Sequence, residues 1–206
     1  MKELVEKLKA SGVLRTPLLI AAFLATDRKH FVPSEFTEEA YVDAPLPIGE
    51  GQTISQPYTV VFMLELLNLR AGQKILDIGF GSGWTTALLA TVAGKDGRVY
   101  GLEIVPALYE FGRGNLQKFG YQNIELHNRS GWEGWPEAAP FDRILASAAA
   151  PAIPKALKAQ LKPGGEMVIP VGPGPACTIK HLKKNTEQDF VEEDYPGFAF
   201  VPFVKK

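Results

Sequence analysis

Cysteine is almost missing from this chain, which has a single one, Cys177, among 206 residues. Because one cysteine cannot form a disulfide within the chain, the composition suits a reducing, cytoplasmic environment. Cys177 stands in an apolar run, so we expect a small buried core residue rather than a nucleophile.

Long hydrophobic runs are missing too, since a membrane span needs about 20 apolar residues and no segment approaches this length. The longest candidate, residues 18–25, is followed by the polar sequence Thr-Asp-Arg-Lys. The N-terminal sequence Met-Lys-Glu-Leu-Val-Glu-Lys carries too many charges for a signal peptide. These features predict a cytoplasmic protein with no membrane partner.

Neither sign of charge is in excess. The chain has 22 lysine and arginine residues against 23 aspartate and glutamate residues, a formal net charge of -1. A dedicated nucleic-acid-binding protein usually shows a basic excess, so we expect no nucleic-acid partner. The histidines His30, His127 and His181 are scattered without metal-ligand spacing, so no metal site is expected.

What the chain does have is a glycine motif after a short apolar segment. Residues 75–78, Ile-Leu-Asp-Ile, are typical of a strand buried on both faces. Gly79, Gly81 and Gly83 follow, and a run of helix-forming residues begins at about Thr85. Strand, glycine turn and helix open a nucleotide-binding βαβ unit, in which glycines let the backbone come close to a ligand.

The glycine spacing distinguishes between classes of cofactor. Dinucleotide-binding turns have the pattern G-x-G-x-x-G, whereas here G-x-G-x-G is preceded by Asp77. The pattern D-x-G-x-G-x-G resembles the first motif of the S-adenosylmethionine-dependent methyltransferases. The next predicted strand ends in Glu103, where a ribose-binding carboxylate is expected. A dehydrogenase and a glycine turn without a ligand are the alternatives.

Strands alternate with helices along the chain. Helices are expected around residues 4–8, 18–26, 57–69, 85–90, 106–119 and 154–161, and strands at residues 75–78, 98–103, 123–127, 141–146, 166–171, 176–182 and 198–204. This alternation predicts an α/β fold with a doubly wound, mostly parallel sheet and an N-terminal helical appendage. Together with the resemblance of the glycine motif, it implies the Rossmann-like fold of S-adenosylmethionine-dependent methyltransferases.

The length suits a single domain, and we expect a monomer because no exposed apolar helix stripe is left over. We divide the domain into N-terminal helices with an active-site loop (1–56), a cofactor-binding core (57–175) and C-terminal strands (176–206). The part from 33 to 57 is expected to be a long irregular loop, which is uncommon unless it has a function. It can cover the carboxyl ends of the strands, where ligands bind in such sheets.

Several strings of residues resemble one methyltransferase family. Residues 40–49 read Ala-Tyr-Val-Asp-Ala-Pro-Leu-Pro-Ile-Gly, and residues 51–57 read Gly-Gln-Thr-Ile-Ser-Gln-Pro. Together with the glycine motif, Glu103 and residues 148–151, 153–157, 161–165 and 169–172, they resemble the protein-L-isoaspartate O-methyltransferases. The resemblance implies a protein repair enzyme that transfers a methyl group from S-adenosylmethionine to the α-carboxylate of L-isoaspartyl residues in damaged proteins and peptides. The ester then closes to a succinimide, whose hydrolysis regenerates some aspartate.

The same resemblance implies the site residues. Ser55 would be catalytic, its hydroxyl holding the acceptor carboxylate in line with the methyl group; an N-cap of the following helix is its structural alternative. The residues implied for cofactor binding are Thr53 and Ile54, Gly79, Gly81 and Gly83, Glu103 on the ribose, and Ser130 and Gly131.

One position departs from the family pattern. After the third strand the family usually has Gly-Asp-Gly, whose acid lies near the adenine, whereas this chain has Arg129-Ser-Gly131. Ser130 is neutral and shorter than aspartate, so we expect adenine binding either to be weaker or to use Asn128 or a water molecule. The alternatives are therefore a related methyltransferase acting on another acceptor, and a non-catalytic binding domain.

Overall fold

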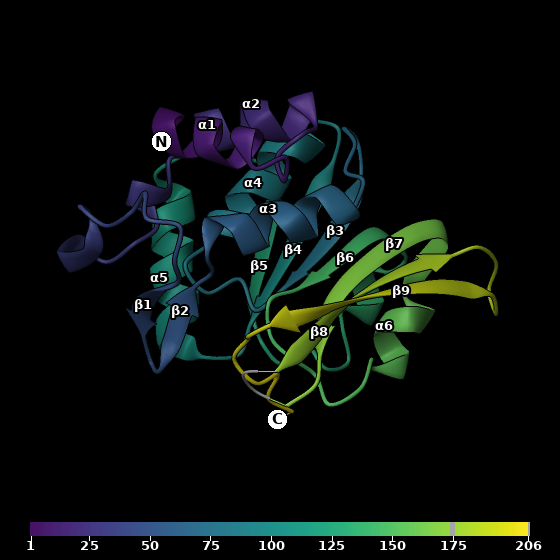
Figure 1. The fold of residues 1–206 in the computed structure, drawn as a ribbon. Helices are drawn as coiled ribbons and strands as arrows, with labels where there is room; N and C mark the ends of the chain where they lie inside the picture. Colours follow the sequence, from purple (N-terminus) through teal and green to yellow (C-terminus); the bar gives the residue numbers. More distant parts are fainter. Residues whose placement is uncertain (174–175, 206) are drawn as a thin grey trace.

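A large, mostly parallel sheet forms the centre of the molecule. In the computed structural model, which describes residues 1–173 and 176–205, the strand order of this sheet is β5-β4-β3-β6-β7-β8-β9 (Figure 1). Its strands are β3 (Lys74–Ile78), β4 (Arg98–Glu103), β5 (Ile124–Asn128), β6 (Phe141–Ala146), β7 (Leu161–Val171), β8 (Cys177–Lys184) and β9 (Phe190–Phe198). The pairs among β5, β4, β3, β6 and β7 are parallel, and β8 and β9 add antiparallel pairs. The expected doubly wound sheet is present.

The central strands of the sheet, such as β3 and β6, are buried on both faces because other parts of the chain pack on each side. Ile75 of β3 belongs to one buried cluster, whereas its neighbour Leu76 belongs to another, as expected where successive side chains point to opposite faces. The helices are α1 (Lys2–Ala10), α2 (Pro17–Ala25), α3 (Pro57–Leu66), α4 (Trp84–Ala93), α5 (Pro106–Gln117) and α6 (Lys155–Ala159).

The first two helices form the predicted N-terminal appendage. The expected stripe of Leu4, Val5 and Leu8 is buried, and α2 packs against α4. Figure 1 shows α1 and α2 lying over α4, away from the β8 and β9 end of the sheet. The predicted division into three parts has a boundary at residue 175, which lies outside the described residues, as does residue 206.

The segment from 33 to 57 is more regular than its sequence suggests, and the prediction of an irregular loop is wrong for residues 46–54. Here β1 (Leu46–Gly49) and β2 (Gln52–Ile54) form an antiparallel hairpin. Its turn uses positive φ angles at Glu50 and Gly51. Such short strands, one of them containing a proline, are too brief for an apolar alternation to be recognised.

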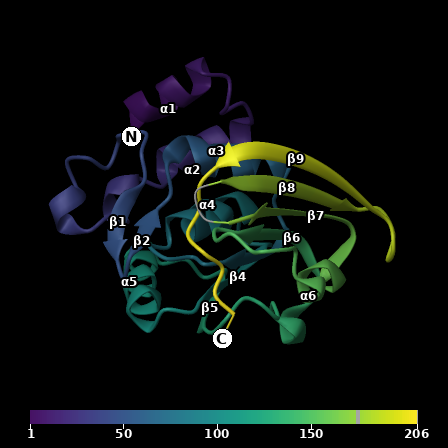
Figure 2. The ribbon, with the colours of Figure 1, turned by 60° about the horizontal axis from the view of Figure 1, so that its bottom comes forward.

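The last strand is also displaced from its prediction. A strand was expected at 198–204, but β9 occupies Phe190–Phe198 and shares only residue 198 with that range. β9 is an edge strand with mostly exposed residues, including Glu192 and Asp194, so it lacks the alternation on which the prediction depends. Residues 199–205, here called the C-terminal tail, leave the end of β9 and run across the edge of the molecule that Figure 2 brings forward.

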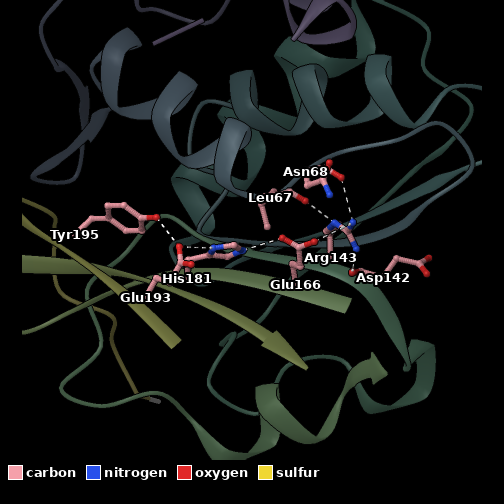
Figure 3. Close-up of polar contacts among 8 residues, drawn as sticks. All are labelled: Leu67, Asn68, Asp142, Arg143, Glu166, His181, Glu193 and Tyr195. Carbon is pink, nitrogen blue, oxygen red and sulfur yellow. Dashed lines mark hydrogen bonds and ion pairs between the residues drawn. The ribbon is translucent and has the colours of Figure 1, made fainter. Parts of the chain in front are cut away.

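A buried polar network ties the end of α3 to the antiparallel strands (Figure 3). The guanidinium of Arg143 donates to the carbonyl oxygens of Leu67 and Asn68 and lies 3.5 Å from Glu166. Glu166 also pairs with Nε2 of His181 at 2.8 Å. Burial alone would raise the pKa of Glu166, but the hydrogen bond with His181 and the charge of Arg143 hold it below its usual value. The network anchors the helix that begins beside the predicted catalytic loop.

Candidate active site

A pocket opens where the order of the parallel strands reverses, at the carboxyl ends of β3, β4 and β6. Such a reversal is where open α/β sheets bind their ligands. This hollow, here called the main pocket, encloses about 840 Å³ including its open mouth. Its walls come from the β1-β2 hairpin, the glycine turn, the end of β4, Arg129 and Gly131, Ser147 and Ala148, and tail residues 201–204.

The glycine turn makes one wall of the main pocket. Gly79 and Gly81 both have positive φ angles, +77° and +47°. A Cβ on Gly81 would lie 3.1 Å from Cδ1 of Ile48, which shows how closely the hairpin covers the turn. Only a residue without a side chain leaves this space open to a ligand.

Gly83 has a different place from the other two glycines of the motif. It does not line the main pocket but forms the N-cap of α4, with φ +85°. A Cβ there would lie 2.9 Å from Leu116 and 3.0 Å from the carbonyl oxygen of Gly112. Gly83 therefore allows α4 and α5 to pack closely.

Glu103 is held against the glycine turn by backbone hydrogen bonds. Its Oε2 accepts from the amide of Gly81 at 3.0 Å, and Oε1 accepts from the amide of Val105 at 2.9 Å. The side chain is 5% exposed and lines the main pocket. A carboxylate has about four lone-pair sites, so Glu103 keeps acceptor capacity for the hydroxyls of a ribose.

Asp77, two residues before the turn, is completely buried. Its Oδ2 accepts from the Thr86 hydroxyl at 2.6 Å, whereas Oδ1 has no hydrogen-bond partner among the described residues. Burial raises the pKa of Asp77 to about 7, against the opposing effect of the Thr86 hydrogen bond and with a further increase from the charge of Glu103. The pKa of this buried carboxyl therefore lies close to neutral pH.

The predicted catalytic string lies on the main pocket as well. Thr53, Ile54 and Ser55 line it, and Ser55 is half-buried with a side chain that makes no hydrogen bond to the described residues. The N-cap of α3 is Gln56, so Ser55 is not the cap that its sequence position allowed. This leaves its hydroxyl available to a ligand.

Arg28 fixes the backbone around Ser55, a role that the sequence did not reveal. Its buried guanidinium donates to the carbonyl oxygen of Ser55 at 3.1 Å and to that of Ala44 at 3.0 Å. The other terminal nitrogen donates to Ala40 and Val42 at 3.0 and 3.2 Å. Burial lowers the pKa of Arg28 to about 10, partly opposed by the charge of Asp43.

A second hollow, here called the side groove, joins the main pocket. It is lined by Pro45, Thr53, Ser55, Gln56, Tyr58, Thr59, Ser147 and residues 196–201. Among the described residues, those that line both hollows are Thr53, Ser55, Ser147 and Val201. Their shared position makes this junction the place where two bound molecules could meet.

Ser130 lies just outside this arrangement. Arg129 and Gly131 line the main pocket, but Ser130 does not. Its hydroxyl accepts from the amide of Trp132 at 3.3 Å and donates to the carbonyl oxygen of Val204 at 3.4 Å. Its predicted place beside the adenine stays a prediction.

Comparison with known proteins identifies the family. The sequence model of the protein-L-isoaspartate(D-aspartate) O-methyltransferases matches residues 1–206. The chain belongs to this family. A curated protein-L-isoaspartate O-methyltransferase from Methanopyrus kandleri is 44% identical, with 98% of this chain and 90% of the relative covered. One from Thermococcus onnurineus is 49% identical, with 97% of this chain and 91% of the relative covered.

The fold of this isoaspartyl methyltransferase family member is also similar to that of a solved relative. A Plasmodium falciparum protein described as a protein-L-isoaspartate O-methyltransferase, solved with S-adenosyl-L-homocysteine, superposes with a TM-score of 0.89 at 25% identity. The match covers 100% of this chain and 98% of that one. Both the resemblance and the fold class predicted from the sequence are confirmed.

Proposed function

We propose that this chain transfers a methyl group from S-adenosylmethionine to the α-carboxylate of L-isoaspartyl residues in damaged proteins and peptides. The observation that carries this proposal is the junction of the two hollows at Ser55, in a chain that matches the isoaspartyl methyltransferase family throughout. The main pocket would hold the cofactor, and the side groove would receive the acceptor peptide.

The residues of the main pocket fit S-adenosylmethionine. Gly79 and Gly81 leave room for the methionine part, Glu103 offers acceptor sites for the ribose hydroxyls, and Thr53 and Ile54 close over the ligand. Gly131 also lines the main pocket, and Ser130 precedes it in the chain. Gly83 contributes by allowing the helix after the turn to pack closely on α5. We assign no metal to this reaction, whose chemistry does not require one.

When bound, S-adenosylmethionine supplies an electrophilic methyl group on a positively charged sulfur. An oxygen of the acceptor carboxylate forms a bond to the methyl carbon while the carbon–sulfur bond breaks, which leaves a methyl ester and S-adenosylhomocysteine. The carboxylate is already the nucleophile, so no general base is needed. Ser55 has the role of holding it in line, and orientation of this kind can supply roughly 7–11 kcal/mol of the barrier.

We further propose that the protein acts as a cytoplasmic monomer on isoaspartyl-containing proteins and peptides, without nucleic-acid or membrane partners. The near-neutral net charge of -1 supports this. None of the helices in the described part of the chain is long and apolar enough to cross a membrane.

A transfer assay with labelled cofactor tests the proposal. An isoaspartyl peptide and its normal aspartyl twin are compared, and a base-labile methyl ester on the isoaspartyl peptide alone is expected. Binding of S-adenosylhomocysteine without any transfer would contradict the repair function and favour a non-catalytic binding domain. Transfer to an RNA base but not to the peptide would indicate a methyltransferase with another acceptor.

A further inference from the structure

We infer that Ser147 is a second hydroxyl ligand of the acceptor carboxylate, which acts together with Ser55 from a different strand end. This inference rests on the proposed function and deepens it, since it assigns a further substrate-binding residue to the same junction. The position of Ser147 in the sheet, its surroundings and the charge of the side groove all support this role.

The sheet places Ser147 at the point where the strand order reverses. It directly follows β6, and its amide donates to the carbonyl oxygen of Ile78, the last residue of the neighbouring β3, at 2.9 Å. A Cβ built on Gly79 would lie 4.0 Å from the Cβ of Ser147. The side chain of Ser147 therefore stands beside the first glycine of the cofactor turn.

The surroundings leave the hydroxyl of Ser147 available to a ligand. Ser147 is half-buried and lines both the main pocket and the side groove. Its hydroxyl makes no hydrogen bond to any residue that the structure describes. Ser55 shares these properties, whereas Thr53, the third hydroxyl that lines both hollows, is exposed.

The described residues of the side groove offer no positive charge to bind a carboxylate. Among the described residues that line it, none is lysine or arginine. Within the side groove, the acceptor carboxylate would therefore be held by neutral donors, and hydrogen bonds from hydroxyls to a carboxylate are stronger than those between neutral groups. Neutral donors also leave the attacking oxygen more nucleophilic than a full ion pair would. Two hydroxyls from separate strand ends can fix the plane of the carboxylate, which one alone cannot do.

The test measures steady-state methylation of the isoaspartyl peptide by the full-length Ser147→Ala variant. We expect kcat/KM for the peptide to fall by about tenfold or more, the size of a lost hydrogen bond to a charged group. The affinity for S-adenosylhomocysteine, measured by calorimetry, should stay within about twofold and the melting temperature should hardly change, because the hydroxyl has no hydrogen-bond partner among the described residues. Ser147→Thr keeps a hydroxyl and should retain more activity than Ser147→Ala.

Two further variants sharpen the test. Ser34→Ala makes the same chemical change at an exposed serine that lines neither hollow, and should leave all parameters unchanged. In the double variant Ser55→Ala/Ser147→Ala, the loss should differ from the product of the single losses, because both hydroxyls bind one carboxylate.

The possible failures are distinguishable. If the wild-type protein methylates the peptide and Ser147→Ala does so at an unchanged rate, the inference is overturned and the proposed function stands. A Ser147→Ala defect that lies wholly in cofactor affinity would also overturn it. If the wild-type protein transfers no methyl group to the peptide, the proposed function fails and the inference fails with it.

Discussion

Loss of the Ser55 hydroxyl should lower the rate of catalysis while leaving cofactor binding and folding nearly unchanged. Since Gln56 is the N-cap of α3, Ser55→Ala removes no cap and should leave the melting temperature nearly unchanged. Its kcat with the isoaspartyl peptide should fall by about tenfold or more, whereas the affinity for S-adenosylhomocysteine by calorimetry should stay close to wild type. An unaltered kcat accompanied by a lower melting temperature would show that the role of Ser55 is structural.

Asp77 predicts a pH dependence of stability. Because burial raises its pKa to about 7, the folded protein keeps a proton that the unfolded chain releases at lower pH. The unfolded chain therefore binds fewer protons between about pH 4 and 7, and stability falls as the pH rises through this window. By pH 8 the buried carboxylate destabilises the ligand-free fold by an amount on the order of 4 kcal/mol.

The Asp77→Asn variant tests this effect. Asparagine can still accept the hydrogen bond from Thr86 but does not ionise. The melting temperature of Asp77→Asn minus that of the wild type, measured without ligand, should increase from pH 5 to pH 8. A difference that is constant over this range would mean that Asp77 titrates at an ordinary pKa.

At the scale of elements, one carboxylate from α3 holds the start of α2. Glu65 accepts from the amides of Arg15 and Thr16 at 2.7 and 2.8 Å, and from the Thr16 hydroxyl at 2.7 Å. Glu65→Ala would leave these donors without their partner, so we expect the free energy of unfolding to fall by about 1–3 kcal/mol in urea denaturation.

A matched control distinguishes this contact from a general effect of charge removal. Glu3 is an exposed residue whose salt bridge with Lys7 lies on the surface of α1. Glu3→Ala removes the same charge and should leave the free energy of unfolding nearly unchanged, because exposed ion pairs contribute little. Equal losses in the two variants would show that Glu65 does not hold α2 in place.

The elements differ in how well the sequence predicted them, for physical reasons. β3, the glycine turn and β4 were predictable because buried parallel strands are continuous apolar runs that end at clear signals. The β1-β2 hairpin was not predictable because its strands are very short, and β9 was not because its residues are mostly exposed at the edge of the sheet. Arg28 was missed because a buried arginine that binds carbonyl oxygens distant in sequence looks like any charged residue after a helix. The tail also lines the pocket beside residues that are distant in the sequence, so the sequence did not reveal this position either.

At the scale of the whole molecule, the main pocket joins parts from both ends of the chain. Ile48 to Ser55 come from the N-terminal quarter, and residues 201–204 come from the tail. The tail is held by hydrogen bonds of Val201 and Phe203 with the backbone of Ala149, each 2.8 Å long. A ligand in the pocket therefore contacts segments from both ends of the chain at once.

This arrangement predicts that ligand binding stabilises the entire fold and depends on the tail. At a free concentration of 100 times Kd, S-adenosylhomocysteine should add about 2.7 kcal/mol, which corresponds to a rise in melting temperature of roughly 5–10 °C for a chain of this length. Phe203, which is buried between Trp132 and the main pocket, should contribute to this effect. In a thermal titration, Phe203→Ala should therefore need more ligand than the wild type to reach the same rise. If the two titration curves coincide, the tail lies beside the ligand without binding it.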